Sequence, residues 1–194
     1  MNAWHPVIER LEADEENLKA HWSLPREEAR FLYLLARMSH ARQSLEVGTS
    51  IGYSTLHLAL AASRQNGHVI SIDASQERQS QAQAHLEQAG LAEHVTLMHG
   101  DARQTLQALQ VENVLFDLAF LDARKSEYHA YLELIEPMLC IGGLLIADNT
   151  RSHRQQMERF IEAITHSIQW ETCDLETPHG LILARKTQAL PPIA

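Results

Sequence analysis

Polar residues that can bind a metal ion follow two apolar segments of the sequence. Asp122 comes directly after the run 116–121, and Asp148 and Asn149 follow the run 143–147. If both runs are strands of a parallel sheet, their carboxyl ends meet at one crevice, where such sheets bind ligands. Two carboxylates and an amide oxygen suit Mg²⁺ first, with Ca²⁺ or Mn²⁺ as alternatives, whereas zinc lacks a histidine or cysteine partner. The pattern predicts a divalent-cation site, with a turn or helix cap as the alternative.

A glycine-containing loop at residues 45–54 is a second candidate site. Apolar residues precede Gly48 and a helical pattern follows the loop, which is typical of a strand that turns into a helix beside a ligand. The spacing is E-x-G-x-x-x-G-x-S and begins at Glu46. Ser50 and Tyr53 stand where the dinucleotide fingerprint G-x-G-x-x-G requires glycine, which argues against a dehydrogenase. We predict a nucleotide-like cofactor here, with a purely structural turn as the alternative.

Two further acidic residues lie where such a fold holds a nucleoside. Asp73 ends the apolar run 68–73, at about the interval after the glycine loop where a carboxylate binds ribose hydroxyls. The alternative for Asp73 is a helix N-cap, but Ser75 is better placed for that role. Asp101 can accept a hydrogen bond from an adenine amino group or cap the helix that begins at Ala102, and these two roles are compatible.

Helical and strand patterns alternate along the rest of the chain. Strands are predicted near 44–48, 68–73, 94–98, 115–121, 142–147, 170–175 and 180–185. Helices are predicted near 6–20, 25–39, 53–64, 75–89, 102–110, 127–139 and 151–167. The alternation indicates an α/β fold with a mainly parallel sheet covered on both faces, and the short turn 176–180 predicts a final antiparallel hairpin. We expect one domain over 1–194, with an N-terminal helical segment 1–40 and a surface tail 187–194.

The combined motifs resemble the class I S-adenosylmethionine-dependent O-methyltransferases, and within them the metal-dependent catechol and caffeoyl-CoA type. The glycine loop carries the first part of the resemblance, and D-x-x-K-x-x-Y from Asp122, followed by D-N at the next strand end, carries the second. It covers roughly residues 25–187. The resemblance implies a Rossmann-like methyltransferase fold with a seven-stranded sheet, the cofactor S-adenosylmethionine (SAM), a divalent cation, a small-molecule acceptor and a homodimer.

The resemblance also implies roles for individual residues. Asp122, Asp148 and Asn149 match the metal ligands, and Lys125 matches the general base that acts beside Asp122. The predicted cofactor-binding residues are Glu46, Gly48, Thr49, Ser50, Gly52, Tyr53, Ser54, Asp73, Ala74, Gly100, Asp101, Ala102 and Asp122. Without its neighbours in the motif, Lys125 would be interpreted as a solvated lysine at the start of a helix.

The chemistry of methyl transfer explains these residue types. Transfer from a sulfonium is an in-line displacement, so the enzyme must align a nucleophilic oxygen with the methyl group and make that oxygen electron-rich. A phenolic oxygen with a pKa of about 10 is mostly protonated at neutral pH. A divalent cation lowers that pKa and orients two adjacent oxygens, while a base removes the proton. A catechol-like acceptor is therefore the expected substrate.

The sequence departs from the resembling family after Asn149. The family has a longer loop there, whereas residues 150–154 lead almost directly into the next helix, so we expect a reduced lid over the acceptor. Arg124, Arg151, His153 and Arg154 can form a basic rim for an acidic acceptor, with a solvated charged face as the alternative.

Composition narrows the class of protein. A net charge of −9 leaves no broad cationic surface for nucleic acid. No apolar run approaches the roughly 18 residues that span a bilayer, and the start lacks a secretory pattern, so we expect no membrane partner and a cytoplasmic location. Cys140 and Cys173 lie in apolar-looking segments and are predicted to be small core residues.

The leading hypothesis is a SAM-dependent O-methyltransferase that uses a divalent cation and acts on a small phenolic acceptor. A metal-independent small-molecule methyltransferase and a SAM-binding protein without catalysis are the two alternatives.

Overall fold

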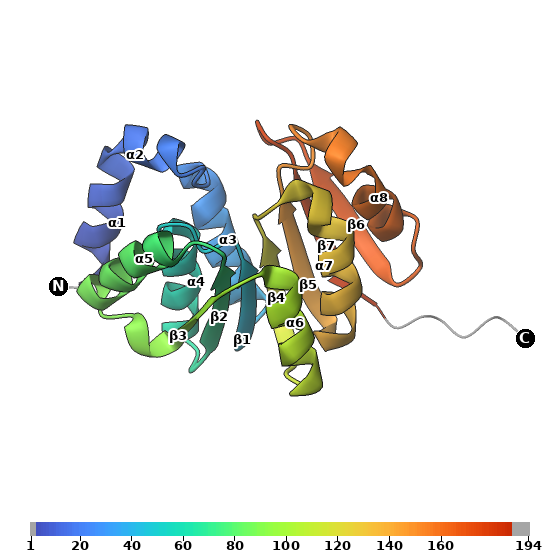
Figure 1. Ribbon diagram of the computed structural model, residues 1–194, viewed down its shortest axis with the longest axis horizontal. Helices are drawn as coiled ribbons and strands as arrows, with labels where there is room; N and C mark the ends of the chain where they lie inside the picture. The colour runs from blue at the N-terminus through green and yellow to red at the C-terminus, as the bar shows by residue number, and fades with distance from the viewer. Residues whose placement is uncertain (1–2, 188–194) are drawn as a thin grey trace, which may run out of the picture.

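A seven-stranded sheet forms the centre of the molecule in the computed structural model, which describes residues 3–187 (Figure 1). Its strand order is β3-β2-β1-β4-β5-β7-β6. The strands are β1 (Gln43–Val47), β2 (His68–Asp73), β3 (Val95–His99), β4 (Phe116–Leu121), β5 (Leu139–Asp148), β6 (Trp170–Leu175) and β7 (Leu181–Lys186). Pairing is parallel from β3 to β5, whereas β7 pairs antiparallel with both β5 and β6. The predicted seven-stranded, mainly parallel sheet with a C-terminal antiparallel hairpin is confirmed.

Helices cover both faces of the sheet (Figure 1). They are α1 (Trp4–Ala13), α2 (Glu15–Ala20), α3 (Arg26–Met38), α4 (Tyr53–Ser63), α5 (Gln76–Ala89), α6 (Ala102–Val111), α7 (Tyr128–Ile135) and α8 (Arg154–Thr165). Successive residues of β4 alternate between two cores: Leu118 and Phe120 pack in the cluster that includes α3 and α4, and Ala119 and Leu121 pack in the cluster that includes α7 and α8. This two-sided burial explains why the strand reads as a continuous apolar run.

Two predicted helices are shorter than expected, for local reasons. The segment 6–20 is two helices because Asp14 leaves helical geometry and its side chain accepts a hydrogen bond from the backbone N–H of Asn17, which caps α2. The helix predicted to reach residue 139 ends at Ile135, where a 3₁₀ turn containing Pro137 leads into β5.

Some side chains of apolar character are exposed. Leu34 and Met38 on α3 are apolar but 51% and 75% exposed, because the helix buries only the stripe that contains Leu32. The core prediction for the two cysteines is wrong, since Cys173 is exposed and Cys140 is only partly buried. Cys173 lies on β6, an edge strand whose central residues are exposed to solvent.

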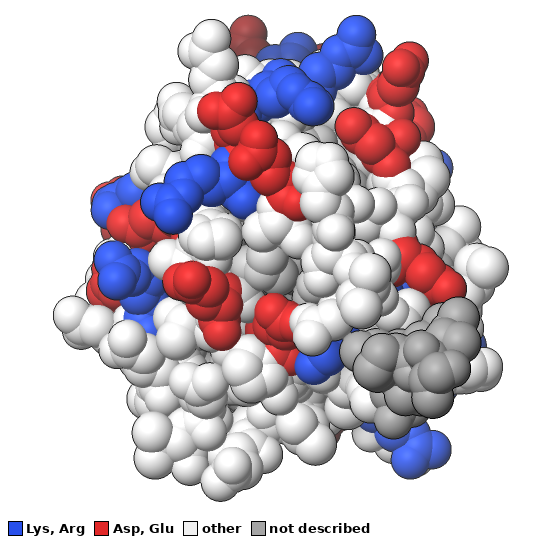
Figure 2. Space-filling model, turned by 90° about the vertical axis from the view of Figure 1, so that its right-hand side faces the viewer, with Lys and Arg blue, Asp and Glu red and all other residues white. Residues whose placement is uncertain are grey.

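Two remaining expectations concern the surface. The predicted tail falls, apart from Thr187, outside the described residues. Among the described residues, none of the helices has both the length and the apolar character needed to cross a bilayer. On the side of the molecule shown in Figure 2, acidic and basic side chains are interspersed and form no single basic patch.

Candidate functional site

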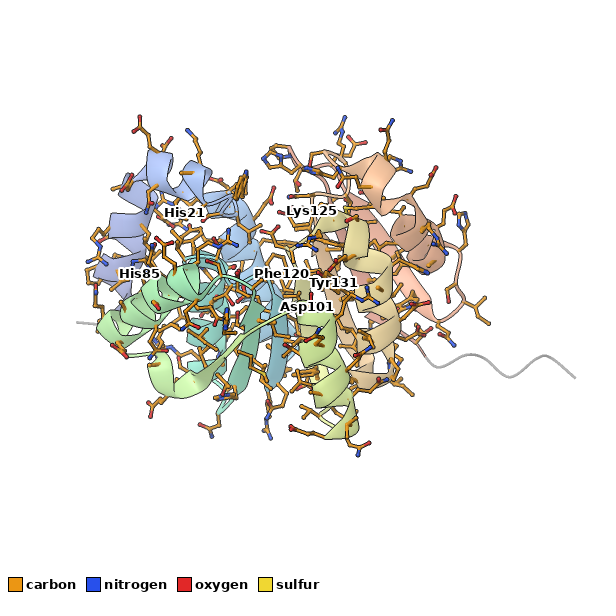
Figure 3. All side chains as sticks on the ribbon, viewed as in Figure 1. His21, His85, Asp101, Phe120, Lys125 and Tyr131 are labelled. Carbon is orange, nitrogen blue, oxygen red and sulfur yellow. The ribbon has the colours of Figure 1, made fainter. Side chains whose placement is uncertain are left out.

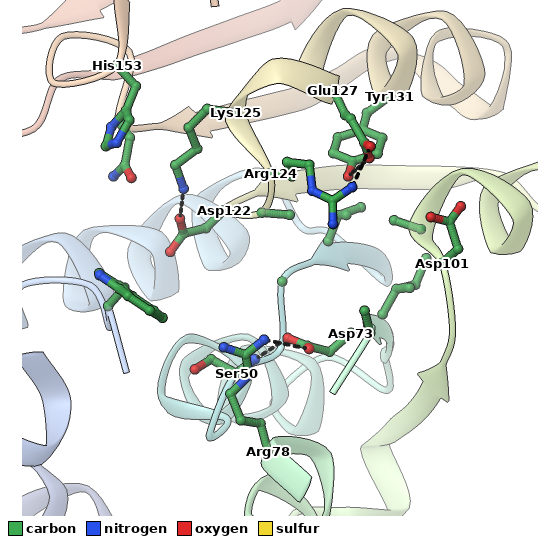
Figure 4. Close-up of a pocket in the computed structure, with 18 of the residues that line it drawn as sticks. Ser50, Asp73, Arg78, Asp101, Asp122, Arg124, Lys125, Glu127, Tyr131 and His153 are labelled. Atoms are coloured by element: carbon green, nitrogen blue, oxygen red, sulfur yellow. Dashed lines mark hydrogen bonds and ion pairs between the residues drawn. The ribbon is translucent and has the colours of Figure 1, made fainter. Parts of the chain in front are cut away.

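A cavity of about 460 Å³ opens at the carboxyl edge of the sheet. Its walls come from the turn after β1, the ends of β2 and β4, the starts of α6 and α7 and the loop after β5 (Figure 4). The strand order reverses between β1 and β4, which is the switch point where ligands bind in open α/β sheets. Strand register brings the polar residues there, because Val47 pairs with Leu121 and Leu121 with Ala147. The residues that follow these strands therefore meet at one edge.

Gly48 packs directly against β4 at this point. Its φ of +111° lies in a region that L side chains rarely adopt, and a Cβ atom there would lie 2.0 Å from the carbonyl oxygen of Asp122. Its N–H donates to the carbonyl of Ile72 at 2.8 Å. Only glycine permits the ends of β1, β2 and β4 to approach this closely, which explains the first glycine of the loop motif.

Asp73 lies at one end of the cavity, where three groups hold its carboxylate. Its Oδ2 accepts a hydrogen bond from the N–H of Ser50 at 2.8 Å, and its Oδ1 accepts from the N–H of Ser75 at 2.8 Å. Arg78 adds an ion pair at 3.3 Å. Ser75, not Asp73, caps α5, as predicted. The carboxylate is therefore fixed in place on the cavity wall, and Oδ2 keeps capacity for a further donor such as a ribose hydroxyl.

Asp101 and Ala102 line the cavity where α6 begins. Asp101 caps α6 by accepting from the N–H of Gln104 at 3.1 Å. Across from them, Glu127 binds both the hydroxyl of Tyr131 at 2.7 Å and the guanidinium of Arg124 at 2.9 Å. Burial, and then the hydrogen bond to Glu127 and its negative charge, raise the pKa of Tyr131, so its hydroxyl stays protonated and donates. The structure thus places the buried ring of Tyr131 on the same cavity wall as Asp101, the predicted adenine contact (Figure 3).

Asp122 and Lys125 form an ion pair at the other end of the cavity. The Lys125 Nζ lies 2.7 Å from Asp122 Oδ1, and both side chains are 14% exposed (Figure 4). The same Nζ lies 5.8 Å from the ring centroid of Tyr128, whose hydroxyl donates to the carbonyl of Leu121. The predicted base and carboxylate are therefore brought together on the cavity wall.

Asp148 and Asn149 lie beside this pair, but only Asn149 lines the cavity. Asp148 is 3% exposed and accepts from the backbone N–H of Asn149 at 2.7 Å and from its side-chain amide at 2.5 Å. Burial, and then the negative charge of Asp122, raise the pKa of Asp148 to about 8. Asn149 has a φ of +66°, which asparagine tolerates better than most residues.

Several predicted cofactor contacts lie behind the wall of the cavity. Gly48, Ser50, Asp73, Ala74, Asp101, Ala102 and Asp122 line it. Within residues 3–187, Glu46, Thr49, Gly52, Tyr53, Ser54 and Gly100 are not part of the lining. Tyr53, for example, is 1% exposed and points its hydroxyl at Glu12 of α1, 3.1 Å away.

Glu46 is the buried centre of a hydrogen-bond network beneath the loop. It is fully buried, and the hydroxyls of Ser54, Thr55 and Ser71 all donate to its carboxylate. Thr49 in turn contacts the Ser71 hydroxyl at 2.6 Å. Burial raises the pKa of Glu46 to about 7. This network ties β1, β2 and α4 together, so Glu46 supports the loop from below.

The lining also contains residues that sequence reasoning missed. They are His21, Trp22, Arg78, Glu127, Tyr131 and Gln156. His21 and Trp22 reach the cavity because the carbonyl of His21 accepts a hydrogen bond from Ser50, which draws the end of α2 to the glycine loop. Arg78 and Tyr131 lie on helix faces whose position depends on tertiary packing, so only the spacing of Arg78 from Asp73 offered a local signal.

The loop after Asn149 is short and held by the β6–β7 turn. The N–H groups of Arg151 and Ser152 both donate to the carbonyl of His179 at 2.9 Å. A Cβ atom at Gly180 would lie 2.4 Å from Arg151, so glycine is required for this contact. Of the predicted basic rim, Arg124 and His153 line the cavity, whereas Arg151 and Arg154 are exposed outside it.

Comparison with known proteins gives matches to methyltransferases along nearly the whole chain. The chain is 34% identical over 130 residues to caffeoyl-CoA O-methyltransferase of Populus kitakamiensis, covering 66% of this chain and 55% of that one. It is 32% identical over 172 residues to flavonoid 3',5'-methyltransferase of Vitis vinifera, covering 82% and 73%. The chain spans about half the length of several curated relatives that it matches, the poplar enzyme included.

Solved structures give the same result. An O-methyltransferase from Bacillus cereus, solved in complex with S-adenosylhomocysteine (SAH), superposes with a TM-score of 0.82 at 30% sequence identity, covering 96% of this chain and 91% of that one. The model of the family described as O-methyltransferase matches residues 4–187. With the strand order and the cavity at its switch point, this match shows that the chain belongs to the SAM-dependent O-methyltransferase family.

Proposed function

We propose that this protein transfers the methyl group of SAM to a hydroxyl of a small phenolic, catechol-like acceptor, with the assistance of a divalent cation. One observation carries the proposal: a single cavity has the ribose-type carboxylate Asp73 at one end and the Asp122–Lys125 pair at the other. The names of the relatives that act on phenolic compounds, and the SAH complex of the Bacillus cereus enzyme, support the acceptor class and the cofactor.

The residues of this chain would divide the work along the cavity. Asp73 accepts from the ribose, and the glycine backbone at Gly48 lets the cofactor approach β4. At the other end the acceptor hydroxyl donates its proton to the neutral amine of Lys125, after the ammonium group that pairs with Asp122 has released one proton to solvent. The oxygen then forms a bond to the methyl carbon while the bond from that carbon to sulfur breaks, which leaves SAH and a methyl ether.

The donor set fits a divalent cation in its chemistry. Asp122, Asp148 and Asn149 would hold it, since the amide nitrogen of Asn149 faces Asp148 and leaves the amide oxygen free. Burial is the largest cause of the raised pKa of Asp148, and the negative charge of Asp122 adds to it; a cation beside the two carboxylates would oppose both effects. A bound cation would lower the pKa of the acceptor hydroxyl and orient a neighbouring oxygen.

A metal-independent methyltransferase is the second candidate, and specific contacts favour it. Asp148 is buried behind the lining with its oxygens occupied by Asn149, and Asp122 already has Lys125 as its partner. In this alternative, alignment of the acceptor and proton transfer to Lys125 would suffice.

Binding and turnover measurements distinguish these functions. We expect SAM to bind in calorimetry and its methyl group to appear on catechols in a panel of phenols and acids, with the rate falling at least about tenfold when the cation is chelated. Activity that survives both chelation and Asp148→Ala would establish the metal-independent reaction. SAM binding with no transfer across the panel would indicate a binding protein, and tight NAD binding without SAM binding would contradict the proposal altogether.

A further inference from the structure

Glu28, near the start of α3, is a buried carboxylate that the proposed reaction does not use. Only 6% of its surface is exposed. Within the described part of the chain, neither of its carboxylate oxygens has a hydrogen-bond partner. A buried carboxylate without donors is costly, and native proteins nearly always pair such groups. Packing alone therefore gives no reason for an acidic residue at this position.

The charges around Glu28 connect it to the acceptor end of the cavity. It lies close enough to Asp122 for their negative charges to repel, and Asp148 is in turn repelled by both. On the β6–β7 turn, the Thr177 hydroxyl lies near Glu28 without the geometry of a hydrogen bond, and it favours the charged form together with His179. Burial outweighs both and raises the pKa of Glu28. The positive charge of Lys125 offsets part of this negative charge, through the ion pair of its Nζ with Asp122. The region thus has an excess of negative charge.

We propose that Glu28 is a positioning residue that raises the affinity of the Asp122–Asp148–Asn149 site for a divalent cation through its negative charge, without being a ligand. This inference rests on the cation in the proposed function. Among the described residues, no three acidic, histidine or cysteine side chains are grouped closely enough to hold an ion together, so Glu28 acts at a distance from the ion. Charges act over such distances in a buried region because solvent screens them little.

The proposal has two consequences of opposite sign. Without a cation, the charge of Glu28 adds to the repulsion between Asp122 and Asp148 and lowers the stability of the fold. With a cation bound, the same charge is attracted to the ion. A residue that only fills space at this position would affect both states in the same direction.

The test uses the full chain and the variant Glu28→Gln, which keeps the shape and removes the charge. Binding of Mn²⁺ alone is followed by loss of the free-ion signal in electron paramagnetic resonance, and thermal unfolding is measured with a chelator. We expect the affinity for Mn²⁺ to fall about 10- to 100-fold, as for other residues that support metal ligands. We expect the melting temperature in chelator to rise by about 2–4 °C. Glu27→Gln is the matched control, because this neighbour is exposed, and it should change neither value.

Three results would overturn the inference. If Glu28→Gln binds Mn²⁺ as tightly as the wild-type chain does, the charge of Glu28 does not contribute to the cation site. The cation site of the proposed function would still stand in that case, because the wild-type chain binds Mn²⁺. A lower melting temperature in chelator with unchanged affinity shows a packing role. No Mn²⁺ binding by the wild-type chain at millimolar concentration removes the cation from the proposed function as well. Glu28→Met, which has a similar length and no charge, repeats the comparison if the glutamine variant does not fold.

Discussion

The two ends of the cavity differ in how their charged groups are paired. At the cofactor end, Asp73 is held by two backbone N–H groups and Arg78 before any ligand arrives. At the acceptor end, Asp122, Asp148 and Glu28 repel one another, with Lys125 bonded to one of them. The Asp73 end is preorganised for a ligand with hydroxyl donors. The Asp122 end has unbalanced negative charge, which a bound cation would neutralise. The comparison indicates that cofactor binding and acceptor activation can be altered separately.

Gly48→Ala should break the junction between the two ends and have the largest effect. The new Cβ would collide with the carbonyl oxygen of Asp122, and the backbone conformation disfavours any side chain. We expect a loss of about 3–5 kcal/mol in the free energy of unfolding, together with loss of SAM binding. Denaturant unfolding and calorimetry measure both. Gly90→Ala is the control, since Gly90 also has positive φ but nearly open space, and should cost only about 1 kcal/mol.

Lys125→Met should affect the acceptor end alone. Loss of the proton acceptor is expected to lower kcat about 10²- to 10⁴-fold while the affinity for SAM stays within a factor of about two. Steady-state kinetics and calorimetry separate the two quantities. Lys19→Met is the control, because the ion pair of Lys19 with Glu15 is exposed and neither residue lines the cavity. An equal loss of SAM affinity would show that the two ends are not independent.

Asp73→Asn should affect the cofactor end alone. The amide keeps the shape but loses the charge that binds ribose hydroxyls and Arg78, so we expect SAM affinity to fall about 10- to 100-fold. Asp117→Asn is the matched control, since Asp117 accepts from two backbone N–H groups at the opposite edge of the sheet. If both variants lose SAM affinity equally, the effect of Asp73 comes from stability and not from contact.

The elements were predictable from sequence because their signals are local. Strand β4 is apolar on both faces, and Gly48 is required by a close approach that its motif encodes. The placement of Glu46 beneath the loop and of Tyr131 on the wall depends on how distant helices pack. No local pattern reports this packing. Glu28 shows the same limit, since an acidic residue in the first turn of a helix is ordinary and only the fold reveals its burial.

The pH dependence of the free energy of unfolding also distinguishes the two ends of the cavity, and it is the smallest of the expected effects. Because the pKa of Asp148 is raised to about 8 in the folded protein, the folded state keeps a proton between about pH 4 and pH 8 that the unfolded chain has lost. Proton uptake by the folded state means that its stability falls as pH rises through this window, by at most about 1.4 kcal/mol per pH unit. Glu46, with a pKa raised to about 7, contributes in the same direction up to that pH.

The variant Asp148→Asn distinguishes the contribution of Asp148 to this pH dependence from that of Glu46, because it removes only the contribution of Asp148. Unfolding free energies measured in chelator at pH 5, 6, 7 and 8 should fall less steeply in this variant than in the wild-type chain over the whole range. Between pH 7 and pH 8, where Glu46 has already ionised, the variant should retain little slope. Parallel slopes would show that the charge conflict at the acceptor end is relieved without a proton on Asp148. In that case the unpaired carboxylate is Glu28, and the same measurement on Glu28→Gln should show the flatter slope.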